Sequence, residues 1–561
     1  MSRSAALIAA LCASFLAACA RDGAPPAASA PAPVTIFTGG PVYTGVEGAG
    51  PAEAVAVSDG VILAVGTRDL VVASAGESPQ IVDLDGAALY PGFTDAHAHL
   101  LGIGMRELTL NLEDVSSIAE LVSIVEANVQ HTGETETIYG RGWIETAWPE
   151  ERMPTRDDLD PVSPDNPVIL IRADGHALVA NSAALDAAGI DDETPDPDGG
   201  KIERYDAGRA TGILIDNAQG LVRELLGETS DAKKRDAYAK ASAVYTAYGW
   251  TGIHAMSVDP QNVAMIEDLS DEDAIKLRVY NSIDQSGLDA LIDSGPRMSA
   301  DGHVTTRAIK LYMDGALGSR GAALIAPYSD RPDTSGLLLM KKEEAVPMLE
   351  KALEAGIQVN THAIGDRGNK LLLDWYEEVF AAHPDKTDVR WRDEHTQILR
   401  TEDIPRYAAL GVIASMQPSH AIGDLYFAPD RLGPDRLAGA YAWRALIDAG
   451  AIIAGGSDAP VERGDPLIEF YAAVARRGLD GYQDANWRPD QAVTREEALK
   501  MFTVWPAYAA FQENMLGTIE PGKQADFTVF SKDIMTIPEE DILTAKSVMT
   551  VVEGEIVFQA E

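Results

Sequence analysis

Residues 90–99 read Tyr-Pro-Gly-Phe-Thr-Asp-Ala-His-Ala-His, an apolar stretch that runs into a His-x-His pair. On an extended strand alternate side chains share a face, so His97 and His99 point the same way and Ala98 points the other way. Two imidazoles side by side at a strand end make half of a metal site. Chance and satisfied core histidines also produce such pairs, so the meaning of this one depends on partners elsewhere in the chain.

The middle of the chain alternates predicted strands with predicted helices, for example at residues 341–355 and 369–382. Together with the strand before His97, the pattern gives eight strand–helix units, the number in a (β/α)8 TIM barrel. An open doubly wound sheet is the alternative, but no Gly-rich phosphate loop follows the first strand, which weakens its nucleotide-binding version. The later predicted strands are Thr251–Met256, Leu277–Ile283, Ala308–Met313, Ile357–His362, Val389–His395, Val412–Gln417 and Ile452–Asp458.

Side chains that could contribute to a metal site occur in four of these later strands. His362, His395 and Asp458 end the fifth, sixth and eighth strands, and Lys310 lies inside the fourth. Barrel enzymes gather reacting groups from the C-terminal ends of several strands. We therefore expect these residues to converge on the His97–His99 pair.

The chemistry of these side chains predicts a divalent metal. Imidazole and carboxylate suit zinc, and also iron, manganese or nickel. Four histidines and one aspartate are enough for one metal, whereas a second metal needs a bridging anion. Burial of Lys310 in an apolar strand should lower its pKa, and a neutral amine can take up carbon dioxide as a bridging carbamate. The alternative for Lys310 is a buried ion pair with Asp314 or Glu394.

The order of these groups resembles the amidohydrolase superfamily over residues 34–561. Four short sequence motifs resemble one branch of this superfamily, the YtcJ-like group or amidohydrolase family 3, which includes N-substituted formamide deformylases. Where relatives of that branch often carry His-Asp, this chain has His254-Ala255, which weakens any role for the second strand. The phrases that carry the resemblance are His176-Ala-Leu-Val-Ala-Asn-Ser182, Lys310-Leu-Tyr-Met-Asp-Gly-Ala-Leu-Gly-Ser-Arg320, His362-Ala-Ile-Gly-Asp366 and Gly456-Ser-Asp-Ala-Pro-Val461.

The resemblance implies an α/β fold: a (β/α)8 TIM barrel, a small composite β-sandwich from both termini and a large insertion after strand 1. It implies a metal-dependent hydrolase of carbon–nitrogen bonds other than peptide bonds, acting on a small amide with one or two zinc ions. Asp458 would accept the proton of the activated water and pass it to the leaving nitrogen. The implied metal ligands are His97, His99, Lys310, His362, His395 and Asp458.

The ends of the chain read differently from its middle. Short predicted strands, punctuated by Gly and Asp, fill residues 34–89 and return at residues 515–561. We expect them to form the composite domain around a barrel at residues 90–514. The insertion subdomain, at about residues 101–250, is too long for a simple barrel connection.

Candidate substrate contacts come from the insertion and from the loops after the strands. We predict substrate binding by His176, Trp143, Arg320 and Gln417, with His420 as a minor contact at the rim. A packed structural role is an equal alternative for Trp143, and Arg320 could instead meet a neighbouring acid. Two further insertion residues that could close over the substrate are Arg141 and Asp174.

The first 33 residues read as a targeting segment. Arg3 precedes an apolar run too short to span a membrane, and Leu16-Ala-Ala-Cys19 resembles a bacterial lipobox. We therefore predict a lipoprotein signal peptide at residues 1–19, lipidation of Cys19, and anchoring on the periplasmic side of the outer membrane. An ordinary signal peptide cleaved nearby is the alternative. The Ala/Pro-rich residues 20–33 would form a tether of roughly 40 Å.

Composition limits the partners of the chain. The 87 acidic and 45 basic residues give a net charge of −42, which argues against nucleic acid or an anionic membrane surface as a partner. The two cysteines, Cys12 and Cys19, precede the predicted fold and leave it no disulfide or cysteine-based zinc site. We expect a small-molecule substrate, and the sequence is also compatible with a homo-oligomer. The alternative functions are a deaminase, an ester or lactone hydrolase, or a ligand-binding lipoprotein without catalysis.

Overall fold

The computed structural model describes residues 33–560 apart from residues 114, 134, 146, 147, 174, 198, 199, 228 and 485. The predicted signal peptide, Cys19 and Asp174 lie outside the described residues, as does all of the tether except Pro33. Among the described residues, no helix combines the length and the apolarity needed to cross a bilayer.

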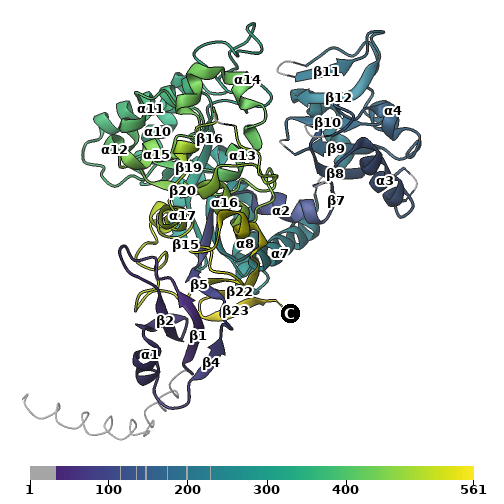
Figure 1. The fold of residues 1–561 in the computed structure, drawn as a ribbon. Coiled ribbons are helices and arrows are strands. Elements are labelled where there is room, and N and C mark those ends of the chain that lie inside the picture. Colours follow the sequence, from purple (N-terminus) through teal and green to yellow (C-terminus); the bar gives the residue numbers. More distant parts are fainter. Residues whose placement is uncertain are drawn as a thin grey trace, which may run out of the picture.

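A nearly closed barrel of parallel strands forms the centre of the molecule (Figure 1). Neighbouring strands follow one another in sequence order from β6 to β20, and each pair is parallel. The last strand meets the first where Asp458 N donates to His97 O over 2.6 Å and Ser457 N donates to the Asp95 carboxylate over 2.9 Å. The structure confirms the predicted α/β barrel. Its strands are β6 (Phe93–Ala98), β13 (Trp250–Val258), β14 (Arg278–Asp284), β16 (Val304–Tyr312), β17 (Gln358–Ala363), β18 (Arg392–His395), β19 (Ile413–Met416) and β20 (Ile453–Gly455), with β15 (Arg297–Met298) antiparallel to β16.

Amphipathic helices cover the outside of the barrel. In α11, Leu372, Tyr376 and Val379 recur at helical spacing and are buried, so one apolar face packs inward. The helices of the barrel region are α8 (Val263–Asp271), α9 (Leu288–Ser294), α10 (Lys342–Glu354), α11 (Asp366–Ala382), α12 (Ile404–Leu410), α13 (Pro418–Asp424), α14 (Ala428–Leu432), α15 (Trp443–Asp448), α16 (Pro466–Ala475), α17 (Arg495–Phe502) and α18 (Val504–Ala509). Short 3-10 turns in this region are η4 (Pro260–Asn262), η5 (Gln285–Gly287), η6 (Pro434–Gly439) and η7 (Pro489–Gln491).

Strands from both ends of the chain share one eight-stranded sheet below the barrel (Figure 1). The seam is the antiparallel pair of β5 and β21, where Phe527 lies opposite Pro91. Phe37, Val55 and Val551 are buried in the core on this sheet. The elements are β1 (Thr35–Val42), β2 (Ala52–Ser58), β3 (Val61–Gly66), α1 (Arg68–Ser74), β4 (Gln80–Asp83), β5 (Ala88–Pro91), β21 (Phe527–Phe530), η8 (Glu539–Thr544), β22 (Ser547–Val552) and β23 (Glu555–Gln559). That this region forms a sandwich domain with the predicted boundaries stays a prediction.

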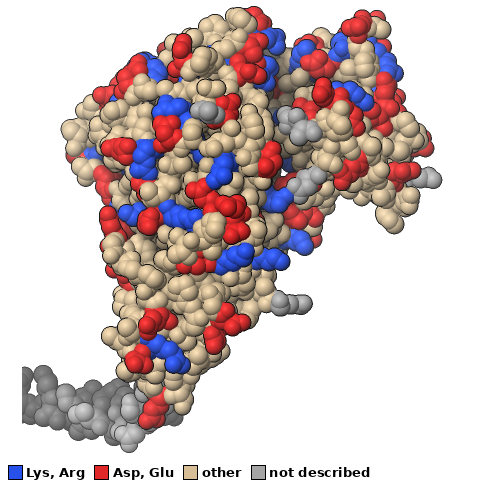
Figure 2. All heavy atoms as spheres, viewed as in Figure 1, with Lys and Arg blue, Asp and Glu red and all other residues tan. Residues whose placement is uncertain are grey.

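The segment after β6 forms a separate six-stranded sheet beside the barrel (Figure 1). Helices α2 (Leu100–Glu107) and α7 (Asp231–Tyr248) connect it to the barrel and pack tightly, since a Cβ on Gly104 would lie 1.7 Å from Ala237 O. Acidic and basic side chains are interspersed on the face in Figure 2, over barrel and insertion alike. The elements of the insertion are β7 (Leu110–Asn111), α3 (Ile118–Val129), β8 (Ile138–Trp143), α4 (Arg156–Leu159), β9 (Val168–Arg172), β10 (Ala177–Ala180), α5 (Ser182–Ala187), β11 (Gly200–Arg204), β12 (Ala210–Asp216), η2 (Asn217–Gln219), α6 (Gly220–Arg223) and η3 (Glu224–Leu226).

Candidate metal centre

The His-x-His pair and Asp458 meet at the C-terminal end of the barrel. His97 lies near the end of β6, His99 follows that strand, and Asp458 follows β20 in a left-handed backbone conformation (φ 61°). Asp458 Oδ1 lies 3.0 Å from His99 Nε2 and 3.4 Å from His97 Nε2. These three residues can offer their ligand atoms to one ion.

Acceptors behind three of the histidines fix which ring nitrogen faces the centre. His97 Nδ1 lies 2.5 Å from Glu394 Oε2, and His99 Nδ1 lies 3.2 Å from the Met256 carbonyl oxygen. His395 Nδ1 lies 2.8 Å from Gln417 Oε1. A carbonyl or an ionised carboxylate can only accept, so each Nδ1 is the donor and each Nε2 is left for a ligand.

Glu394 belongs to a buried ionic chain beneath His97. Arg392 Nε lies 2.7 Å from Glu394 Oε1, and both side chains are 0% exposed. Burial favours the neutral acid, yet Arg392 and His97 hold the pKa of Glu394 well below its usual range. On its other side Arg392 donates to His254 Nδ1 over 2.8 Å. The Nδ1 of His254 is therefore already occupied by a hydrogen bond from a cationic side chain.

Lys310 lies in the same centre. Its residue is 1% exposed, and its Nζ lies 3.4 Å from His97 Nε2. Burial lowers the pKa of Lys310 to about 8, against the opposing effects of Glu394 and Asp458. Within the described residues, neither Asp314 nor Glu394 approaches the amine closely enough for an ion pair. The lowered pKa fits the prediction for a buried amine.

His362 stands between the cluster and the loop after β16. Its ring centroid lies 4.6 Å from that of His395, and its Nε2 lies 3.6 Å from Asp314 Oδ1. Burial lowers the pKa of His362 to about 3, so the ring is neutral and able to bind a metal. Asp314 is held in turn by the backbone N–H groups of Ile364, Gly365 and Ala323.

A second group of donors uses the other oxygen of Asp458. His395, His420 and Asp458 can also bring their ligand atoms together, and Asp458 Oδ2 lies 3.7 Å from His420 Nε2. His420 was predicted from the sequence only as a minor contact at the rim.

The donor set fits a divalent cation. Ligands about 2.1 Å from a tetrahedral ion lie about 3.4 Å apart, close to the separations around Asp458. Asp458 Oδ1, His362 Nε2 and His420 Nε2 are buried polar atoms without a hydrogen-bond partner among the described residues. Buried polar atoms normally have a hydrogen-bond partner. Unpaired nitrogen and oxygen atoms that converge on one point therefore indicate a site for a cation. Burial opposes ionisation of Asp458, but the histidines hold its pKa well below the usual range, leaving a carboxylate ready to bind or to accept a proton.

Comparison with known proteins decides the family. The profile of the Amidohydrolase family matches residues 80–558. The putative amidohydrolase YtcJ of Bacillus subtilis is 34% identical over 535 residues, which cover 93% of this chain and 99% of YtcJ. This chain belongs to the amidohydrolase family.

Two further relatives of this amidohydrolase extend the comparison. The N-substituted formamide deformylase of Arthrobacter pascens is 28% identical over 525 residues, which cover 91% of this chain and 95% of the deformylase. The crystal structure of a metal-dependent hydrolase from Pyrococcus horikoshii matches with a TM-score of 0.74 at 27% identity, covering 90% of this chain and 99% of that chain. The likeness to both extends over almost the whole of each protein.

The predicted substrate contacts of this amidohydrolase lie in different surroundings. Trp143 is 0% exposed in the core of the insertion, where its indole N–H donates to Leu170 O over 2.9 Å. This placement favours the packed alternative for Trp143, because its ring lies among the core side chains of the insertion and its indole N–H is already bonded there. Gln417 is also buried, and its carbonyl oxygen accepts from His395 Nδ1 and so orients that ring; substrate binding by Gln417 stays a prediction.

The other two candidates are partly exposed. Arg320 pairs with Asp330 over 2.7 Å, which is the neighbouring acid of the sequence-based alternative. His176 Nδ1 lies 2.8 Å from Asp216 Oδ1 on the insertion. Substrate binding by Arg320 and His176 stays a prediction.

Sequence reasoning missed the support of the centre in this amidohydrolase. Arg392 and Glu394 lie in a four-residue strand that is buried throughout. Charged side chains in a fully buried strand are costly unless paired, and this was the available signal. Met256 contributes through its carbonyl group, which no side-chain pattern could reveal.

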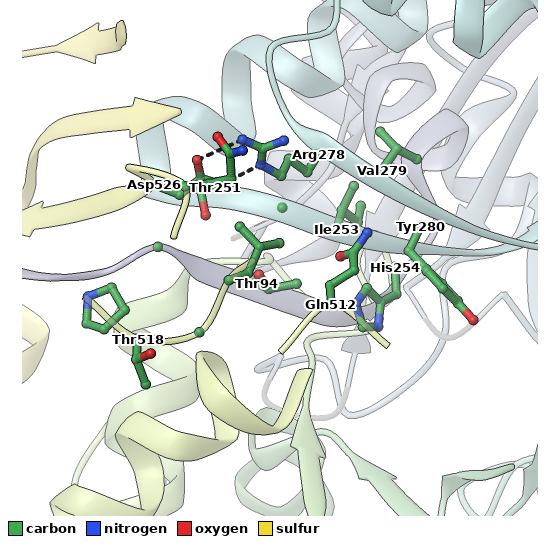
Figure 3. A pocket seen from close by; sticks show the side chains of 16 residues that line it. Thr94, Thr251, Ile253, His254, Arg278, Val279, Tyr280, Gln512, Thr518 and Asp526 are labelled. Atoms are coloured by element: carbon green, nitrogen blue, oxygen red, sulfur yellow. Dashed lines mark hydrogen bonds and ion pairs between the residues drawn. The ribbon is translucent and has the colours of Figure 1, made fainter. Parts of the chain in front are cut away.

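A pocket at the opposite end of the barrel is separate from this centre (Figure 3). It lies where β6, β13 and β14 begin and is lined by Thr94, Thr251 and Arg278 among others. On the side of the eight-stranded sheet, the pocket is bounded by Arg278, whose side chain forms an ion pair of 2.6 Å with Asp526. Its volume of about 20 Å³ has room for a single water and not for a substrate.

Proposed function

We propose that this amidohydrolase hydrolyses a carbon–nitrogen bond other than a peptide bond, in a small amide, with one or two zinc ions. The observation that carries the proposal is the Asp458 carboxylate, set within 3.4 Å of two imidazole nitrogens whose opposite ring nitrogens are already bonded. The metal-dependent hydrolase and the formamide deformylase among its relatives support the reaction class.

The residues of the centre would have separate roles in the reaction. A divalent cation on these histidines would lower the pKa of a bound water and polarise the scissile carbonyl. Asp458, already ionised, accepts the proton that the water loses when its oxygen attacks the carbonyl carbon. Asp458 then donates that proton to the nitrogen as the carbon–nitrogen bond breaks, which releases an amine and a carboxylate. Glu394 and Gln417 hold the imidazoles of His97 and His395 in position throughout.

The Lys310 amine is a candidate site of carbamylation. Its amine is buried and its pKa lies near 8, so a substantial neutral fraction exists at physiological pH. We propose that this neutral amine adds carbon dioxide and loses a proton, which gives a carbamate beside His97 able to bridge two cations. Labelled bicarbonate should introduce a carbamate carbon signal into the zinc-loaded wild type and not into Lys310→Met. Equal labelling of both proteins would contradict the carbamate.

The test of the reaction is amine release. Zinc-loaded protein is offered N-formyl and N-acyl derivatives of small amines, and the free amine is measured with an amine-reactive dye. The Asp458→Asn variant should release amine at least about 10²–10⁴-fold more slowly, the usual contribution of general acid–base catalysis. Full activity of Asp458→Asn would refute the proton-transfer role. Release of ammonia from an amidine-type ring or hydrolysis of lactones, without amide cleavage, would favour the alternative reactions.

We further propose that the protein is exported and anchored by a lipid on Cys19. The support is the sequence Leu16-Ala-Ala-Cys19 after an apolar run. Palmitate labelling in a bacterial host should depend on Cys19 and disappear in Cys19→Ser. Labelling of both proteins, or of neither, would count against the anchor.

A further inference from the structure

Backbone hydrogen bonds join the two segments that carry the metal centre. Asp458 N donates to His97 O over 2.6 Å, and His99 N donates to Ala459 O over 2.8 Å. Asp458 has a left-handed backbone conformation (φ 61°), which is unfavourable for a residue with a Cβ and persists only where neighbouring contacts hold it. The position of the Asp458 carboxylate therefore depends on how firmly its loop is fixed to the His-x-His segment.

A buried carboxylate, Asp95, completes this junction. Its Oδ1 accepts from Ser457 N over 2.9 Å and from His97 N over 3.1 Å. Its Oδ2 accepts from Ser457 Oγ over 2.6 Å and from the Tyr245 hydroxyl over 3.0 Å. All four of these residues are 0% exposed. One carboxylate thus joins strand β6, the loop after β20 and helix α7.

Ser457 transmits this constraint to Asp458. Its Oγ donates to Asp95 and accepts from Ala459 N over 3.0 Å. The Tyr245 hydroxyl lies 3.3 Å from the same Oγ. Because one serine holds the backbone on both sides of Asp458, a shift of that serine would move the Asp458 carboxylate.

Tyr245 connects the junction to the insertion. It lies on α7, the helix by which the chain returns from the insertion to the barrel (Figure 1), and its ring stacks on Trp250 with centroids 6.1 Å apart. A Cβ on Gly464 would lie 2.8 Å from the Tyr245 hydroxyl, so the hydroxyl is tightly enclosed on that side. Helix α2, which packs on α7, begins directly after His99. Both connections of the insertion therefore meet the segments that build the metal centre.

A buried tyrosine hydroxyl normally finds a hydrogen-bond partner, so a bond alone does not indicate a role in the centre. Tyr238 lies seven residues earlier on the same helix and is 2% exposed. In the described part of the chain its hydroxyl forms no hydrogen bond with Asp95 or Ser457. Tyr245 differs because its hydroxyl shares an acceptor with the backbone next to Asp458.

We propose that Tyr245 is a positioning residue for Asp458, which acts through Asp95 and Ser457 and couples the insertion to the metal centre. Loss of its hydroxyl would remove one of the four hydrogen bonds that fix the Asp95 carboxylate and would let the loop after β20 shift. The inference rests on the metal centre of the proposed function and not on the reaction assigned to that centre.

Cobalt spectroscopy tests the proposal without a substrate. Cobalt(II) is bound in place of zinc by wild type, Tyr245→Phe and the control Tyr238→Phe, because its visible absorption reports the geometry of its ligands. At saturating cobalt the spectrum of Tyr245→Phe should differ from that of wild type, and its zinc affinity in chelator competition should fall about 2–30-fold. Tyr238→Phe should keep the wild-type spectrum. A wild-type spectrum in Tyr245→Phe, or an equal change in Tyr238→Phe, would overturn the proposal.

A second variant keeps the test decisive if Tyr245→Phe fails to fold. Ser457→Ala removes the hydroxyl that links Asp95 to Ala459 N, so it should also change the cobalt spectrum, and a wild-type spectrum would overturn the proposed link. Failure of the wild type to bind cobalt or zinc would refute the metal centre itself. Absence of amine release from a protein whose cobalt spectrum responds as expected would refute only the proposed reaction.

Discussion

Replacing Glu394 by Gln should weaken both the fold and the metal centre. Glu394 is completely buried, accepts from His97 Nδ1 and pairs with the equally buried Arg392. Glutamine keeps the size and loses the charge, so Arg392 remains buried without its anion. Removing one partner of a buried ion pair costs about 3–5 kcal/mol of folding free energy. Loss of the carboxylate behind a ligating histidine lowers metal affinity about 10–100-fold.

Two assays separate these effects. Urea denaturation of the metal-free proteins measures the free energy of unfolding, and competition with a zinc chelator measures affinity. Glu267→Gln is the matched control, because Glu267 pairs with Arg297 at 2.8 Å where both side chains are partly exposed (25% and 42%). Such a surface pair is worth below about 1 kcal/mol.

The pH dependence of the free energy of unfolding also tests the role of Glu394. Its pKa is depressed in the folded protein, so the folded state holds fewer protons than the unfolded chain. The stability it contributes is present above the unfolded pKa of about 4.3 and is lost as pH falls through the folded pKa. The stability difference between wild type and Glu394→Gln should therefore be full at pH 7 and shrink in acid. A difference below about 1 kcal/mol at pH 7, with unchanged zinc affinity, would refute the reasoning.

Three other perturbations test separate parts of the structure. Gln417→Leu removes the acceptor of His395 Nδ1 and should lower zinc affinity about 10–100-fold in calorimetric titration; an unchanged affinity would show that Gln417 does not orient the ring. Trp143→Ala should destabilise the insertion by about 3–5 kcal/mol in thermal melts and limited proteolysis, and an unchanged melt would contradict its core role. Removal of the metal by a chelator should lower the melting temperature. Zinc added back at about 100 times its Kd should raise the free energy of unfolding by about 2.7 kcal/mol. A melting temperature that does not change with chelator would argue against the metal centre.

The barrel was predictable because its signal is periodic. Each predicted strand overlaps an observed one, since a strand buried on both faces reads as an apolar run. Boundaries were less accurate: the helix expected at residues 369–382 begins at Asp366, where an acidic residue in the first turn favours an earlier start. The candidate ligand residues could be named because they stand in or at the ends of the strands in a fixed order.

The rest of the site depends on contacts that sequence spacing does not encode. Gln417 looked like a rim contact, and only its 2.8 Å approach to His395 identifies it as the acceptor behind that ring. Trp143 could not be assigned because its burial depends on how the insertion packs. His420 lies four residues beyond the end of the short strand β19, and its distance from Asp458 is set by the closure of the barrel.

The seam between β5 and β21 has a consequence for biosynthesis. The Tyr90 hydroxyl meets the Asp533 carboxylate, 443 residues later in the chain. At about 5–20 residues per second, roughly 20–90 s pass between the emergence of the two from a ribosome. Throughout that interval the edge of β5 has no neighbour on the β21 side. Completion of this sheet is therefore among the last events of folding, and the nascent chain carries an open strand edge while the whole barrel is being made.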